Sequence, residues 1–296
     1  MDLGNLCKIN IDSSASPSKQ IHFARRLYLK SMLPYLHLNL YFWHPNVPTF
    51  GLMLWLAALT AAFIMDRGFK RAHLDADAVG MVAITVLAGI VGAKLWHVID
   101  TPLEFREVGW RVLWDTAGFA WFGGLVFGIA ALLFQGWWAQ IGSLRTLDLA
   151  APAAAVGYGI GRIGCFLSGD GCYGIETNLP WGVGFPNGIE PTLPGVRVHP
   201  TPLYELGAGL LIGWFLWWRA GKRRATGAIL GEYLILSGIA RFLVEFIRRN
   251  PKILWHLSNA QLASAGSIII GIGLVLWASR RSAEAPVAAA AVGKTA

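Results

Sequence analysis

The stretch GRIGCFLSGDGCYG, at residues 161–174, places charged side chains at the end of an almost uncharged run. Arg162 and Asp170 stand there, directly after the apolar segment TLDLAAPAAAVGYGI at residues 146–160. A charged side chain at the depth of a bilayer costs between ~3 and ~15 kcal/mol. We therefore expect these two residues to have a function or a charged partner.

Other apolar segments also contain ionisable side chains. Arg241 and Glu245 are four residues apart, the spacing of an ion pair on one helix, and Glu205 begins another segment. An arginine stays charged in any protein site, and its planar guanidinium group suits phosphate or carboxylate oxygens. If Arg162 and Arg241 face one cavity beside carboxylates, they would suit a phospholipid head group. The alternative is a structural role, in which the charges only orient the helices.

Two of the three cysteines, Cys165 and Cys172, lie in the same stretch as Arg162. Three cysteines cannot build a disulfide framework. The sequence around them has neither a CxxC motif nor a paired histidine, so the pattern does not favour a metal site. We expect both to be small apolar packing residues.

The composition indicates an integral membrane protein. The 296 residues are 55% hydrophobic and only 14% charged, whereas ordinary globular domains carry about 25% charged residues. The 14 tryptophans and 7 tyrosines suit a protein whose rings gather at two membrane interfaces. The net charge is +8, but the basic residues occur in small groups beside apolar segments. This pattern favours anionic lipid head groups over nucleic acid as their partner.

Seven apolar segments approach or reach the ~17–25 residues that cross a bilayer. They lie at about 50–65, 79–99, 120–138, 147–167, 202–218, 228–246 and 261–278. We therefore expect an all-α polytopic membrane protein with seven transmembrane helices. The fourth segment is rich in alanine and glycine, which let helices pack closely, so we expect it to be central.

The loop charges predict the orientation of the chain. Basic residues follow the first, third, fifth and seventh segments: Arg67, Lys70, Arg71, Arg145, Arg219, Lys222, Arg223, Arg224, Arg280 and Arg281. The positive-inside rule then favours an outer N-terminus and a cytoplasmic C-terminus, although Arg248, Arg249 and Lys252 oppose it.

We expect one seven-span domain at residues 46–282. Residues 1–45 would form an N-terminal extension that is either interfacial or disordered, and residues 283–296 a disordered tail. The alternative to a long basic extension is that translation begins at Met32 rather than Met1.

The motifs around the charged residues resemble those of the prolipoprotein diacylglyceryl transferases of bacterial inner membranes. The family signature has the form GRxGNFxNGExWG, and the chain reads GRIGCFLSGDGCYG. Other similar segments occur in the family's order: GLMLWLA at 51–57, GAKLWHVI at 92–99, FGGL at 122–125, HPTPLYE at 199–205, GEYLILSGIARFLVEFIRR at 231–249 and AQLAS at 260–264. The resemblance covers about residues 50–281.

The resemblance implies transfer of a diacylglyceryl group from phosphatidylglycerol to the lipobox cysteine thiol of a preprolipoprotein, the first step of bacterial lipoprotein maturation. The nucleophile then belongs to the substrate, so neither cysteine of the stretch needs to be one. The implied partners are phosphatidylglycerol, preprolipoprotein signal peptides and membrane lipid, without nucleic acid. The family's reaction implies no cofactor and no metal, and its location is the inner membrane, where the chain would be multi-pass.

The resemblance also implies roles for individual residues. Arg162 matches the signature arginine and is the candidate to bind the phosphate, and Arg241 matches a second essential arginine. The implied catalytic residues are Arg162, Arg241, Asp170 and His199. The implied substrate-binding residues are Arg162, Gly123, Gly124, Tyr204, Glu205, Glu245 and Arg248.

The chain departs from the family pattern at several positions. Phe122 stands where many members have a histidine, Cys165 and Ser168 replace asparagines, and Asp170 replaces a glutamate. Nearby arginines can lower the pKa of the substrate thiol enough to make a strong base unnecessary. Alternatively, His199 or Asp170 takes the proton. A third explanation is a paralogue that binds phospholipid with an altered acceptor or no activity. An unrelated transporter or channel is the last alternative. The sequence has no internal repeat, which is an argument against a transporter.

Overall fold

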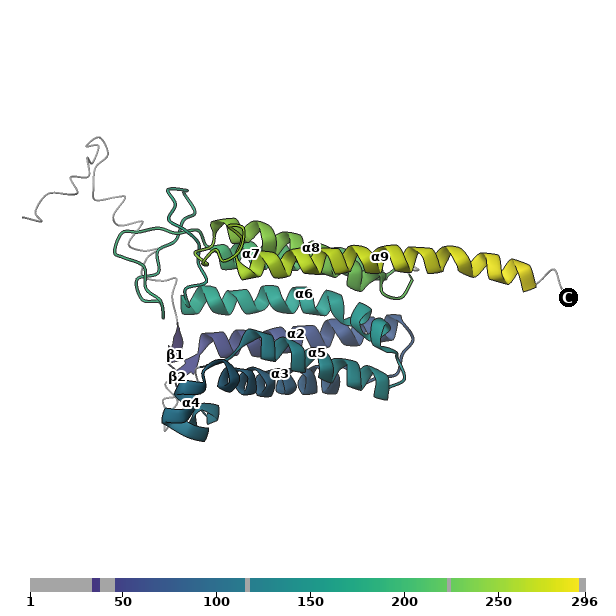
Figure 1. Cartoon of the computed structure of the whole chain (residues 1–296), viewed down its shortest axis with the longest axis horizontal. Coiled ribbons are helices and arrows are strands. Elements are labelled where there is room, and N and C mark those ends of the chain that lie inside the picture. Colours follow the sequence, from purple (N-terminus) through teal and green to yellow (C-terminus); the bar gives the residue numbers. More distant parts are fainter. Residues whose placement is uncertain (1–33, 38–45, 115–117, 223–224, 293–296) are drawn as a thin grey trace, which may run out of the picture.

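The computed structural model describes residues 34–37, 46–114, 118–222 and 225–292. Most of the predicted N-terminal extension, with the alternative start at Met32, lies outside the described residues. The long helices run along one common direction and pack side by side (Figure 1). They are α2 (Thr49–Arg71), α3 (Ala78–Asp100), α5 (Trp121–Trp138), α6 (Ser143–Ser168), α7 (Thr201–Ala220), α8 (Ala228–Val244) and α9 (Asn259–Val292).

Shorter elements connect these helices. They are α4 (Pro102–Val108) and the 3-10 helices η1 (Gly109–Trp114) and η2 (Glu245–Ile247). Two three-residue strands, β1 (Tyr35–His37) and β2 (Asn46–Pro48), pair antiparallel just before α2. The fold is therefore mostly helical, as expected, and this small sheet is the part that the apolar segments did not predict.

Among the residues that the structure describes, five helices are long and apolar enough to cross a membrane: α2, α3, α5, α6 and the part of α9 up to Arg281. Their outward faces carry apolar side chains that are open to the surroundings, such as Leu87 (62% exposed) and Ile269 (70% exposed). Contiguous apolar surface of this kind needs lipid or another apolar partner to cover it. The structure thus confirms a helical membrane protein.

The helix α6 is central, as its alanine and glycine content predicted. It packs against α2, α5, α7 and α8, and more of it is buried than of the other four candidate spans. Small residues allow this close packing, because a Cβ atom on Gly209 of α7 would lie 2.8 Å from the Ala155 carbonyl oxygen. The close approach brings the polar side chains of α6 and α7 within reach of one another.

One long loop, residues 169–200, lies at the end of the bundle opposite the C-terminal end of α9 (Figure 1). It begins at Gly169, which ends α6 in the left-handed conformation (φ 58°) that glycine adopts without strain. A small core of Tyr173, Phe185 and Val198 holds the loop together. The Ile175 amide donates to the Ile247 carbonyl at 2.8 Å and so ties the loop to η2, directly after α8.

The C-terminal helix extends further than the sequence predicted. The helix α9 continues to Val292, into the segment 283–296 that was expected to be disordered. Alanine is the strongest helix former, so a tail of low complexity that is rich in alanine can still continue an existing helix.

Candidate active site

Three arginines and two glutamates meet near the C-terminal end of α6. Arg162 comes from α6, and Glu205 comes from near the start of α7. Arg241 lies on α8, Glu245 begins η2, and Arg248 follows η2 directly. We call these five residues the arginine–glutamate cluster. Each of them was a predicted site residue, and their spacing in the sequence spans 86 positions (162 to 248).

Glu205 is the carboxylate that all three arginines share. Its Oε2 atom lies 3.1 Å from Arg248 Nη1 and 3.4 Å from Arg162 Nε. Its Oε1 atom lies 3.9 Å from Arg241 Nη1, and the side chain is only 4% exposed. A carboxylate buried to this extent is stable only with charged partners, which the three guanidinium groups supply.

Glu245 holds two of the arginines from the other side. Its Oε2 atom lies 2.5 Å from Arg241 Nη1 and 3.9 Å from Arg248 Nε. Its Oε1 atom accepts hydrogen bonds from Asn250 Nδ2 at 2.6 Å and from Ser258 Oγ at 2.7 Å. The side chain is fully buried, so this carboxylate acts as a fixed support for the two guanidinium groups.

The cluster has one positive charge in excess, because three guanidinium groups face two carboxylates. Within the part of the chain that the structure describes, Arg162 Nε, Arg241 Nη1 and Arg248 Nε have no hydrogen-bond partner of good geometry. The side chains of Arg162 and Arg241 are 16% and 25% exposed. The cluster is therefore suited to bind a group with one negative charge, such as a phosphodiester.

Tyr158, which sequence reasoning missed, joins Arg162 to Glu205. Its hydroxyl donates to Glu205 Oε1 at 2.6 Å and accepts from Arg162 Nη2 at 2.7 Å. The guanidinium group of Arg162 also lies over its ring, 4.7 Å from the centroid. Tyr158 is one helical turn before Arg162, and this i,i+4 spacing is the signal by which the sequence could have revealed it.

The two cysteines of the signature stretch face the same arginine. Arg162 Nη1 lies 3.7 Å from Cys165 Sγ and 3.8 Å from Cys172 Sγ. An oxygen of Asp170 lies within 4.8 Å of both sulfur atoms, and Asp170 Oδ1 accepts from the Cys172 amide at 3.1 Å. Cys165 is buried, as expected of a packing residue, but Cys172 is partly exposed and lies in a polar setting.

This setting changes the acidity of Cys172, which lies beyond the end of α6. Its pKa is lowered to about 7, mainly because the Cys165 thiol donates a hydrogen bond to it. Burial and the charge of Asp170 oppose the shift, whereas the guanidinium group of Arg248 favours it. A thiol with this pKa is substantially ionised near neutral pH.

The donor atoms of Cys165, Asp170 and Cys172 are close enough to bind one soft metal ion together. However, a guanidinium group is directed at both sulfur atoms. It already supplies positive charge beside both sulfur atoms. The geometry therefore favours thiol chemistry at this position.

His199 and Tyr204, two further predicted site residues, lie together at the junction of the loop and α7. His199 Nδ1 is 3.3 Å from the Tyr204 hydroxyl, which also accepts from Trp181 Nε1 at 2.8 Å. Tyr204 precedes Glu205, so these polar groups adjoin the arginine–glutamate cluster along the chain.

Gly123 and Gly124 lie where α5 crosses α3. A Cβ atom on Gly123 would overlap the carbonyl oxygen of Gly92, and one on Gly124 would lie 3.4 Å from the carbonyl oxygen of Gly89. Helix packing alone therefore accounts for a glycine at position 123. Phe122, at the position of the family's histidine, is 55% exposed at the start of α5.

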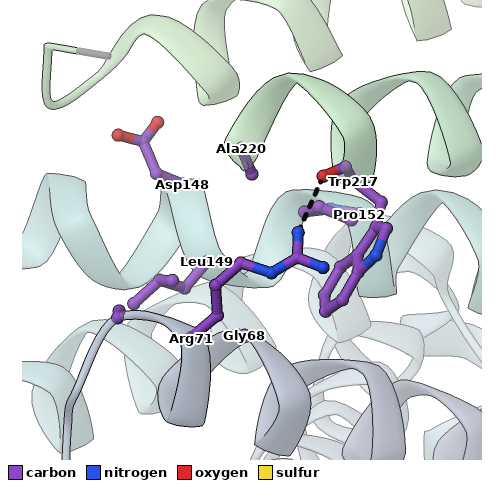
Figure 2. Close-up of a pocket in the computed structure, with 8 residues that line it drawn as sticks. Gly68, Arg71, Asp148, Leu149, Pro152, Trp217 and Ala220 are labelled. Atoms are coloured by element: carbon purple, nitrogen blue, oxygen red, sulfur yellow. Dashed lines mark hydrogen bonds between the residues drawn. The ribbon is translucent and has the colours of Figure 1, made fainter. Parts of the chain in front are cut away.

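A separate pocket lies at the opposite end of α6, between α2, α6 and α7 (Figure 2). There Arg71 donates to the Trp217 carbonyl at 3.1 Å and lies over its indole ring, 4.0 Å from the centroid. Asp148 accepts from the amides of Gly227 and Leu230 at the start of α8. The polar groups of this pocket thus have structural partners, and we do not assign the chemistry to it.

The fold is that of a helical membrane protein, and the cluster gives it a buried group of three arginines and two glutamates. The family model for prolipoprotein diacylglyceryl transferase matches residues 40–277. The chain is 33% identical to the phosphatidylglycerol–prolipoprotein diacylglyceryl transferase of Clostridium tetani, over 75% of this chain and 90% of that protein. It is 30% identical to the enzyme of the same name from Leptospira interrogans, over 77% of this chain and 88% of that protein. It is 33% identical to the enzyme of the same name from Cupriavidus pinatubonensis, over 79% of this chain and 85% of that protein.

The chain therefore belongs to the prolipoprotein diacylglyceryl transferase family. The resemblance that the motifs indicated is confirmed, although the histidine position carries Phe122 and the signature asparagines are replaced.

Proposed function

We propose that the protein transfers a diacylglyceryl group from phosphatidylglycerol to the lipobox cysteine thiol of preprolipoproteins. Its relatives carry this activity in their names. The observation that carries the proposal is the arginine–glutamate cluster, which combines residues of three family motifs and has one positive charge in excess. That charge matches the single negative charge of the phosphodiester in phosphatidylglycerol.

In the proposed reaction, the substrate thiolate attacks the glycerol carbon that carries the phosphate ester. A carbon–sulfur bond forms, the carbon–oxygen bond breaks, and its electron pair goes to the phosphate of the leaving glycerol phosphate. The leaving group therefore gains a second negative charge. Arg162 and Arg241 would stabilise this charge, because preorganised donors act most strongly where charge develops.

The other members of the cluster would keep these arginines in place. Glu205 and Glu245 hold the guanidinium groups from two sides, and Arg248 is shared between both carboxylates. We also propose the roles that the resemblance implies for the remaining residues, which are Asp170, His199, Tyr204, Gly123 and Gly124.

We further propose that α7 and α8 cross the membrane as well, giving seven spans. The 20 residues of α7 extend for about 30 Å, which is the thickness of the hydrocarbon core, and α8 packs beside α7 and α9. The basic groups that follow α2, α5, α7 and the apolar part of α9 would then be cytoplasmic. The N-terminus would be outside, and the cluster would lie toward the outer face of the bacterial inner membrane.

The alternative function is a paralogue that binds phospholipid with an altered acceptor or no activity, which Phe122 at the histidine position favours. Complementation of a bacterial strain depleted of its own transferase separates the two. We expect growth and a diacylglyceryl-modified lipoprotein with this chain, and neither with Arg162→Ala at equal expression. Absence of lipidation by well-expressed wild-type protein would reject the transferase function.

A further inference from the structure

We propose that Cys172 accepts the proton of the substrate thiol, and so supplies the base that the chain lacks at Phe122. The inference rests on the proposed function, because deprotonation of the lipobox thiol is a step of that reaction. It gives the thiol of this loop a catalytic part without making it the nucleophile.

The geometry around the Cys172 sulfur favours a thiolate. Arg162 Nη1 lies 3.8 Å away, and the Cys165 thiol and the Arg248 guanidinium group also form hydrogen bonds with it. Each of these contacts places a donor or a positive charge beside the sulfur, and both stabilise its charged form. Arg162 and Arg248 also bind Glu205, so the thiolate would offset the excess positive charge of the arginine–glutamate cluster. That excess returns when Cys172 takes the proton of the substrate thiol, before the leaving group gains its second negative charge.

Exposure separates the roles of the two cysteines. Cys165 is 7% exposed, so it is suited to donate to its neighbour from within the helix packing. Cys172 is partly exposed, so it is the better placed of the two to meet a substrate thiol. Phosphate bound at Arg162 would bring the glycerol carbon close to the same guanidinium group that contacts the Cys172 sulfur.

The acidity of Cys172 suits this task. Its pKa of about 7 lies below the ~8.5 of an ordinary thiol, so the thiolate is present at neutral pH. A base works best when its pKa is near the operating pH. The charged and titratable groups that face Cys172 are Arg162 and Cys165 on α6, Asp170 on the same loop, and Arg248 after η2.

The step is balanced without an oxidant or a further reactant. The Cys172 thiolate takes the proton from the lipobox S–H group, and the new lipobox thiolate attacks the glycerol carbon. After the carbon–oxygen bond breaks, the Cys172 thiol gives its proton to the glycerol phosphate or to water. Cys172 returns to the thiolate and never forms a bond to the diacylglyceryl group.

Two measurements on detergent-solubilised full-length protein test the inference. The first is the rate of transfer from phosphatidylglycerol to a lipobox peptide between pH 5.5 and 9. A positioned base raises the rate of a reaction by about 10²–10⁴-fold, so we expect the rate of transfer by Cys172→Ser to be lower by at least about 100-fold at pH 7. The wild-type rate should fall as the pH drops below about 7, because Cys172 becomes protonated. The rate of Cys172→Ser should already fall below about pH 8.5, where the substrate thiol itself becomes protonated. Cys7→Ser, which changes a cysteine outside the described residues, is the matched control and should behave as wild type.

The second measurement needs neither activity nor a change at Cys172. The rate at which iodoacetamide alkylates Cys172 in the Cys7→Ser protein, read by peptide mass spectrometry, should be half-maximal near pH 7. The inference would be overturned if the wild type is active and Cys172→Ser keeps both its rate of transfer, within about threefold, and its pH profile. The proposed function would then stand unchanged. A half-maximal pH of about 8.5 or above would also overturn the inference. An inactive wild type would reject the proposed function, and the catalytic role of Cys172 with it.

Discussion

The substitution Tyr158→Phe removes one hydroxyl group and leaves the ring in place. That hydroxyl donates to Glu205 at 2.6 Å and accepts from Arg162 at 2.7 Å, so two hydrogen bonds to charged groups are lost. Such bonds each contribute about 1.5–3 kcal/mol. Glu205 still has three guanidinium partners in the variant, which reduces the penalty for its lost donor. We therefore expect a loss of about 2 kcal/mol in the free energy of unfolding.

The same change should affect transfer through the position of Arg162. Without the hydroxyl, Arg162 Nη2 loses its shortest contact, and the guanidinium group can rotate away from the proposed phosphate position. We expect the rate of transfer to fall about tenfold, which is less than the ~10²–10³-fold loss typical when a stabilising donor is removed entirely.

Thermal unfolding in detergent and transfer to a lipobox peptide are the two assays. Tyr233→Phe is the control, because Tyr233 lies on α8 and packs against the separate core of Ala151, Leu216 and Ile229. The double variant with Glu205→Gln tests the contact itself. Neighbouring groups in one network usually couple by 0.5 kcal/mol or more, so a coupling energy below about 0.5 kcal/mol would refute this account of Tyr158.

Three further changes test the site and the packing around it. Arg162→Lys should recover little of the transfer that Arg162→Ala loses, because a single ammonium group cannot replace the planar guanidinium group with its paired donors. Full activity of the lysine variant in membranes would contradict bidentate phosphate binding. Phe122→His should not reduce transfer measured in the same membranes, since the ring is 55% exposed; a severe loss would mean that the site depends on that ring. Gly209→Val should destabilise the protein by about 1–3 kcal/mol in thermal unfolding, because its Cβ atom would lie 2.8 Å from the Ala155 carbonyl oxygen. Gly207→Ala, whose added Cβ atom has no neighbour within 4 Å, is the control, and equal stability of the two variants would contradict the packing of α6 on α7.

The sequence by itself predicted the helices well, because the signal is local. A bilayer requires long apolar runs, and the runs in the sequence correspond to the long helices from α2 to α9. The errors fall where this signal is weak. The strand pair β1–β2 consists of three-residue strands, and the alanine-rich tail is as compatible with a helix as with disorder.

The motifs also revealed most of the charged residues of the site. Arg162, Glu205, Arg241 and Glu245 stood out because charges are costly within apolar segments, and the family resemblance added Arg248. The resemblance gave no distances, and it did not indicate which carboxylate each arginine would bind.

Only the tertiary structure decided how these groups combine. The rotation of α6 against α7, set by glycines that allow close contact, directs Tyr158 and Arg162 at Glu205. The turn of the loop after Gly169 brings Cys172 back to Arg162, ten residues away in the sequence. Helix length depends on the residues within one segment, whereas these contacts depend on the packing of several segments. For this reason the membrane fold could be inferred from the sequence, and the thiol beside the clustered arginines could not.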